Sequence, residues 1–87
     1  MRYKIKTIIK TCDACPAQWS GKTECGKYVY IRYRHGYFRA EIDEDVVTAA
    51  DTGDPLDGWM SDESMQEMTA EVFDFSAARW VDSREEL

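Results

Sequence analysis

The chain has 87 residues, of which 44% are hydrophobic and 32% are charged. This is enough apolar material for one thin core, and no Gly/Ser-rich or Pro-rich linker divides the chain, so we expect a single domain over residues 1–87. No run of 18 apolar residues occurs, and the N-terminal segment is too polar for a signal peptide. Three cysteines at irregular spacing suit a reducing compartment. We therefore expect a cytoplasmic protein with no membrane contact.

The net charge of −6 hides a strong asymmetry. Residues 1–40 hold nine of the eleven Lys and Arg residues but only two acidic residues, whereas residues 41–87 hold two Arg and fifteen Asp or Glu residues. The two halves either neutralise each other across the fold or face charged partners.

In chain order, the first predicted element is a strand over residues 2–10, where Tyr3, Ile5, Thr7 and Ile9 alternate with mostly basic residues. Residues 17–42 follow as a three-stranded meander with turns at 24–26 and 35–36. A two-residue turn at 35–36 pairs residues whose numbers sum to 71. That register predicts core pairs Val29–Ile42, Ile31–Ala40 and Tyr33–Phe38, and opposite-face pairs Tyr30–Glu41, Arg32–Arg39 and Arg34–Tyr37.

The acidic second half predicts loops and one helix. Residues 43–58 are rich in turn-forming residues, so we expect a loop with at most one short strand. Ser61 is a good N-cap, and apolar residues recur at helical spacing, which predicts a helix over residues 62–74. The predicted fold class is therefore α+β: a small antiparallel meander of three or four strands packed on one α-helix.

One constellation in the sequence has the chemistry of a binding site. Arginine binds phosphate or carboxylate through its planar fork, and aromatic rings on the same surface stack on a flat ligand. The candidate ligand-binding residues are Trp19, Tyr28, Tyr30, Arg32, Arg34, Tyr37 and Arg39. The alternative is that the acidic half covers these arginines as intramolecular partners. Nucleic acid is a weaker candidate because the overall negative charge repels a polyanion.

Other sites are less well supported by the sequence. Cys12, Cys15, Cys25 and His35 could be written as a zinc site, but Cys25 and His35 fall at turns at opposite ends of one predicted strand. We therefore expect no metal and no cofactor. With one histidine and no Ser or Cys beside a base, we also expect that the chain is not an enzyme.

A second candidate surface is an acidic array that could mimic a nucleic-acid backbone toward a partner protein. It is formed by Glu63, Glu67, Glu71 and Asp74.

The chain also resembles a group of short proteins encoded by bacteriophages and prophages. The resemblance covers about residues 15–73 and rests on Gln18-Trp19, Gly21, Gly26, the segment YIRYR at 30–34, Gly36, and the helix entry at 57–70. This chain has Cys25 where that pattern has an aspartate. The resemblance implies a phage accessory protein that counters host defence in the host cytoplasm, and it assigns no functional residues.

These observations give a leading hypothesis and two alternatives. The leading hypothesis is a non-enzymatic protein that sequesters an anionic, nucleotide-like immune signal on its Arg/Tyr face, as a homo-oligomer that deepens the site. The first alternative is an acidic inhibitor of a host defence protein, of the anti-CRISPR type. The second is a minor structural or interaction protein.

Overall fold

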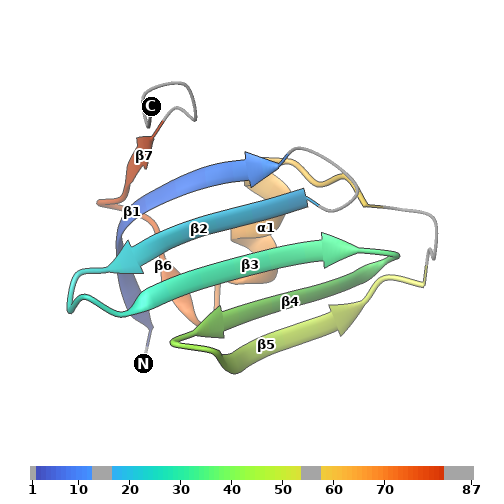
Figure 1. Cartoon of the computed structure of the whole chain (residues 1–87), viewed down its shortest axis with the longest axis horizontal. Helices are drawn as coiled ribbons and strands as arrows, with labels where there is room; N and C mark the ends of the chain where they lie inside the picture. Colours follow the sequence, from blue (N-terminus) through green and yellow to red (C-terminus); the bar gives the residue numbers. More distant parts are fainter. Residues whose placement is uncertain (1, 13–16, 54–57, 82–87) are drawn as a thin grey trace.

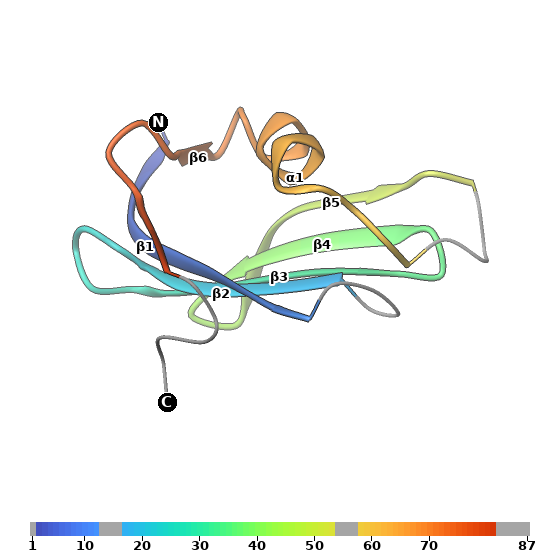
Figure 2. The same ribbon diagram turned by 90° about the horizontal axis from the view of Figure 1, so that it is seen from above.

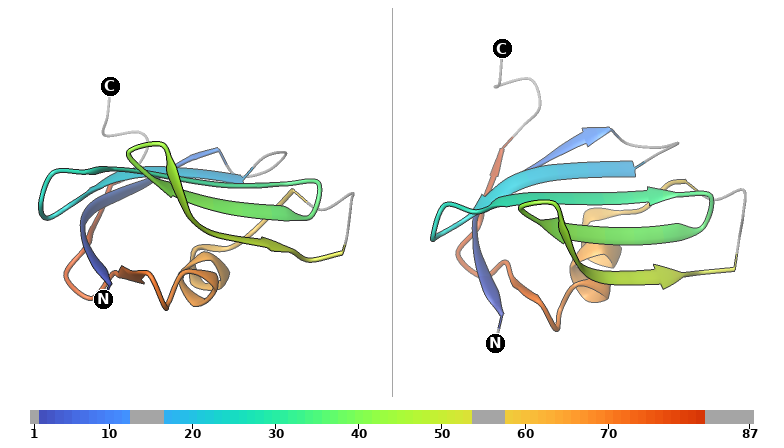
Figure 3. Two further views of the ribbon diagram at one scale, coloured as in Figure 1. Left: turned by 90° about the horizontal axis from the view of Figure 1, so that it is seen from below. Right: turned by 60° about the horizontal axis from the view of Figure 1, so that its bottom comes forward.

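A computed structural model describes residues 2–12, 17–53 and 58–81, and over these residues the chain is mostly β-structure. One mixed sheet has the strand order β5-β4-β3-β2-β1-β6, and β7 also pairs with β1 (Figure 1). The elements are β1 (Tyr3–Cys12), β2 (Ala17–Thr23), β3 (Tyr28–Arg34), β4 (Tyr37–Ile42), β5 (Asp45–Asp51), α1 (Asp62–Met68), β6 (Phe73–Asp74) and β7 (Arg79–Val81). The sheet curls into a half-barrel, and α1 lies on its concave side (Figures 2 and 3).

The expected fold class, a three- or four-stranded antiparallel meander on one helix, is therefore wrong. The sheet has seven strands, and β6 and β7 run parallel to β1. Residues 43–58 were expected to form a loop with at most one short strand; they include the seven-residue β5, which pairs antiparallel with β4 from Tyr37–Asp51 to Ile42–Asp45, and residues 54–57 lie outside the described residues. The small and acidic residues of β5 are typical of an edge strand. Such a strand has a neighbouring strand on one side only, so its sequence needs less apolar patterning than that of a central strand.

The central meander and its register are confirmed. The β3–β4 pairs run from Val29–Ile42 to Arg34–Tyr37 and include Arg32 opposite Arg39. His35 and Gly36 have φ values of 53° and 75°, which are those of the left-handed two-residue turn that matches the twist of a hairpin. Turn chemistry thus sets which residues of β3 and β4 share a face.

The first strand is confirmed in position but not in its simple alternation. The β1–β2 register shifts between Ile5 and Thr7, so that Ile5 and Ile8 both enter the core, and Lys10 pairs with Trp19. A bulge of this kind inserts one extra residue and bends the strand. The bend lets the N-terminal end of β1 pair with β6 while its middle pairs with β7.

The helix begins where predicted but ends earlier. Ser61 caps it, its hydroxyl accepting a hydrogen bond from Ser64 N at 3.1 Å. The buried Thr69 is its C-cap, with φ −107° and ψ 8°, which lie outside the helical range. Its hydroxyl donates to Met65 O at 2.9 Å, and its carbonyl accepts from Phe73 N at 2.8 Å. Phe73 then belongs to β6 rather than to the helix.

The core lies between the concave face of the sheet and α1. Trp19 joins the two layers, donating from Nε1 to Asp62 Oδ1 at 2.8 Å. Lys10 adds a second link, with its Nζ donating to Met60 O at 2.7 Å and lying 5.1 Å from the Trp19 ring. The largest fully buried side chains are Trp19, Tyr33, Phe38, Phe73, Ile5, Ile8, Ile31 and Met65.

Candidate functional site

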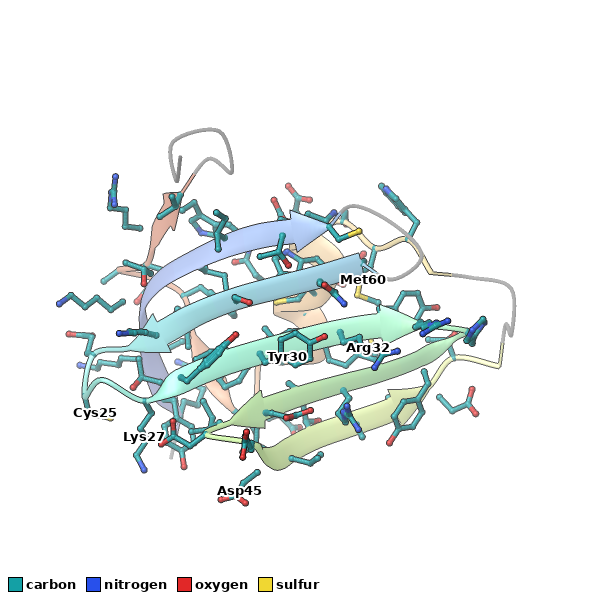
Figure 4. All side chains as sticks on the ribbon, in the orientation of Figure 1. Cys25, Lys27, Tyr30, Arg32, Asp45 and Met60 are labelled. Carbon is teal, nitrogen blue, oxygen red and sulfur yellow. The ribbon has the colours of Figure 1, made fainter. Side chains whose placement is uncertain are left out.

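The side of the sheet opposite α1, here the outer face, carries most of the predicted ligand-binding residues. On β3, Tyr30 and Arg32 alternate with the buried Val29, Ile31 and Tyr33. Period-2 alternation therefore puts them on the face away from the helix, toward the viewer in Figure 4. Residues that share this face by register are Gln18, Ser20, Lys22, Tyr28, Tyr30, Arg32, Arg34, Tyr37, Arg39 and Glu41.

Trp19 does not belong to this set. It is fully buried on the concave side, where it anchors α1. An aromatic side chain in a strand can lie on either face of the sheet. Trp19 lies on the core side because it pairs in β2 with the buried Ile31 of β3. Of the seven predicted residues, six therefore lie on the outer face and Trp19 does not.

The arginines surround a shallow depression of about 300 Å³, here the basic depression, lined by Arg32, Arg34, His35, Tyr37 and Arg39. Arg32 and Arg39 lie directly opposite on β3 and β4. Like charges in this position destabilise a sheet unless an anion lies between them. Arg34 donates from Nε to His35 Nε2 at 3.1 Å, so this ring nitrogen acts as an acceptor.

The acidic half covers the arginines only in part. Arg39 Nε lies 2.9 Å from Glu41 Oε2, an ion pair by distance. The Nε–H does not point at this oxygen and is buried without a hydrogen-bond acceptor. Within residues 2–12, 17–53 and 58–81, Glu41 is the only carboxylate within ion-pair distance of Arg32, Arg34 or Arg39. The basic depression thus has a net positive charge.

A second depression, of about 490 Å³, is lined by the next residues along β3 and β4 on the outer face, Tyr30 beside Arg32 and Glu41 beside Arg39. It is here called the aromatic depression and is lined by Tyr28, Tyr30, Glu41, Asp43 and Glu44. Asp43 and Glu44 form the two-residue β4–β5 turn, with φ values of 49° and 75°. Asp43 Oδ1 accepts from Tyr28 N at 2.8 Å, which ties this turn to β3. The sequence analysis did not identify these carboxylates, because it treated residues 43–58 as a loop with at most one short strand. The available signal was the pair of acidic residues directly before the segment that forms β5, which could have predicted a hairpin turn.

The predicted acidic array does not form one helix face. Glu63 and Glu67 are exposed on α1, but Glu71 lies in the turns after the helix and Asp74 lies in β6. Asp74 Oδ1 accepts from Ser76 N at 2.9 Å. Hydrogen bonds from Ser76, and then the nearby Arg2 and Lys4, lower the pKa of Asp74 below its ordinary value. Asp74 therefore takes part in a local turn rather than in a shared partner-facing surface.

The residues weighed for zinc are far apart in the topology. Cys25 lies in the β2–β3 turn and His35 in the β3–β4 turn, at opposite ends of β3, and Cys15 lies outside the described residues. Within the part of the chain that the structure describes, no group of three or more His, Cys, Asp or Glu side chains is placed to hold a metal ion. In the same part, no helix is long and apolar enough to cross a membrane.

Comparison of the chain with models of known protein families, with curated proteins and with solved structures found no significant match.

Proposed function

We propose that this chain is a non-enzymatic binding protein that holds an anionic, nucleotide-like small molecule on its outer face. The phosphate or equivalent anion binds in the basic depression, and the flat part of the ligand contacts the neighbouring tyrosines. The resemblance to phage-encoded proteins suggests the role of this binding, which is to sequester a host immune signal.

The observation that carries the proposal is the excess of cationic groups around one depression. Three guanidinium groups from two adjacent strands surround it, and one carboxylate is paired with them among the described residues. Arg32 faces Arg39 directly, so an anion between them would relieve repulsion as well as gain charge-assisted hydrogen bonds. Exposed aromatic area lies on the same face: Tyr37, 48% exposed, lines the basic depression, and Tyr28, 44% exposed, lines the second depression.

The test is to replace Arg32 by Gln and to measure binding of nucleoside monophosphates by isothermal titration calorimetry. Arg32 is more diagnostic than Arg39, because removing Arg39 would also leave Glu41 without its partner. Loss of one charge-assisted contact should weaken binding by about 1.5–3 kcal/mol, or roughly tenfold to a hundredfold in Kd.

Lys27→Gln is the matched control. It also removes one positive charge, but from the exposed β2–β3 turn outside both depressions (Figure 4). Binding by the Lys27 variant should equal that of the wild type. If Lys27→Gln and Arg32→Gln weaken binding equally, attraction is nonspecific and the proposed site is wrong. If no nucleotide binds the wild type, the proposed function itself is wrong.

A further inference from the structure

We infer that the ligand is a single nucleotide with a guanine-type base, bound with the base in the aromatic depression and the phosphate in the basic depression. This inference rests on the proposed function and adds the orientation and the base to it. The observation behind it is that two depressions of different chemistry are lined by neighbouring residues of β3 and β4 on one open face.

The two depressions lie at the spacing that one nucleotide requires. Tyr30 lines the aromatic depression and Arg32 lines the basic depression. They are two residues apart on the same face of β3, so their Cα atoms are about 7 Å apart. Figure 4 shows the two side chains next to each other along the strand. A ribose can span this separation while its base and its 5′-phosphate reach different depressions.

Charge determines which end of the nucleotide enters which depression. Glu41, Asp43 and Glu44 line the aromatic depression, and none of the arginines and lysines within residues 2–12, 17–53 and 58–81 does so. A phosphate placed there would be repelled, whereas the basic depression attracts it. A polynucleotide carries a further phosphate on the ribose 3′ oxygen, and the same three carboxylates would repel that added charge at short range. The face therefore favours a mononucleotide over single-stranded RNA or DNA.

The carboxylates also select the base. An ionised carboxylate only accepts hydrogen bonds, so it favours a base edge with neighbouring N–H donors. Guanine has two such donors, N1–H and the 2-amino group, whereas adenine presents an N1 acceptor next to its amino group. Tyr28 and Tyr30 supply rings on which the base can stack.

Glu44 is the residue best placed to read the base. One oxygen of Asp43 is already bonded to Tyr28 N, and Glu41 lies against Arg39. Glu44 is exposed, lines the depression, and makes no side-chain hydrogen bond or ion pair with any residue that the structure describes. The structure thus assigns base recognition to Glu44 and phosphate binding to Arg32.

Calorimetry with GMP, IMP and AMP at one salt concentration tests the inference. IMP lacks the 2-amino group, so it should bind about tenfold more weakly than GMP, and AMP should bind about tenfold to a hundredfold more weakly. Glu44→Gln should remove most of this preference by weakening GMP binding while leaving AMP binding nearly unchanged. Gln has the same side-chain length as Glu, and it faces the same steric restriction at the positive φ of this position.

Asp45→Asn is the control, since Asp45 is exposed next to Glu44 but does not line the aromatic depression (Figure 4). This variant should retain the full preference for GMP. If GMP, IMP and AMP bind equally and all lose affinity in Arg32→Gln, the base assignment is overturned while the proposed function stands. If the dinucleotide GpG binds much more tightly than GMP, the single-nucleotide assignment is overturned. If none of these ligands binds, both proposals fail together.

Discussion

Single side chains on this sheet differ mainly in how their charges are compensated. Arg39 has a carboxylate at 2.9 Å but a buried Nε–H without an acceptor, and Arg32 has no carboxylate partner among the described residues. Asp74 is the opposite case, because Ser76 donates to it and Arg2 and Lys4 surround it with positive charge. The uncompensated charge of Arg32 belongs to the proposed anion site, whereas Asp74 is compensated within its own turn.

The lowered pKa of Asp74 predicts an acid-sensitive turn between β6 and β7. A carboxyl whose pKa is lower in the folded chain than in the unfolded chain stabilises the fold when it is ionised. Its contribution is present above the unfolded value of about 3.9 and is lost as the pH falls through the folded value. In an NMR titration, Ser76→Ala should raise the pKa of Asp74 partway toward its ordinary value, because it removes the side-chain hydrogen bond. A pKa of Asp74 at or above the ordinary value in the wild type would contradict this account.

At the level of strands, the β1–β2 contact is sterically constrained at Gly21. Gly21 pairs with Ile8 just after the bulge in β1, and a Cβ at Gly21 would collide with the carbonyl oxygen of Thr7. Since the obstacle is backbone, no side chain can rotate to relieve it. The close approach of β1 to β2 at Thr7 and Ile8 therefore depends on the absence of a side chain at this position.

We therefore expect Gly21→Ala to destabilise the protein by about 2 kcal/mol or more, as judged by urea denaturation. Ser20→Ala is the control in the same strand. It removes one exposed hydrogen bond to Tyr28 Oη and should cost about 1 kcal/mol or less. Equal stability of the two variants would show that β1 can move away from β2 at low cost.

Over the whole molecule, one buried tryptophan joins the sheet to the helix. Trp19 Nε1 donates to Asp62 Oδ1 at the start of α1, and Lys10 lies between the rings of Trp19 and Trp59, with its Nζ 5.1 Å and 5.8 Å from their centroids. The carboxylate acceptor makes this hydrogen bond stronger than a neutral one. It holds α1 on the concave side and leaves the outer face uncovered by the helix.

Trp19→Phe should destabilise the fold by about 1.5–3 kcal/mol in urea denaturation, because Asp62 loses its donor and a small cavity remains. Nucleotide binding to the outer face should be unchanged in the folded variant. Trp59→Phe is the control; Trp59 is 59% exposed, so its replacement should cost less than about 1 kcal/mol. A specific loss of nucleotide affinity in folded Trp19→Phe would place the ligand on the other side of the sheet.

Features that depend on neighbours in the chain could be predicted from the amino-acid sequence alone. The turn at His35-Gly36 requires positive φ at both positions, so it sets the β3–β4 register and with it the shared face of Tyr30, Arg32 and Arg39. The N-cap at Ser61 depends on one side chain and the helix that follows it. Local chemistry of this kind can be read without knowing the rest of the fold.

Features that depend on pairing between distant segments are fixed only in the folded chain. Residues 62–74 have helical spacing throughout, but pairing with β1 draws Phe73 into a strand. Tertiary contacts also bury Trp19 and bring Asp43 and Glu44 to the tyrosines of β3. Hydrophobic periodicity cannot foresee such contacts, because the partner strand lies up to 70 residues away, as in the Tyr3–Phe73 pair.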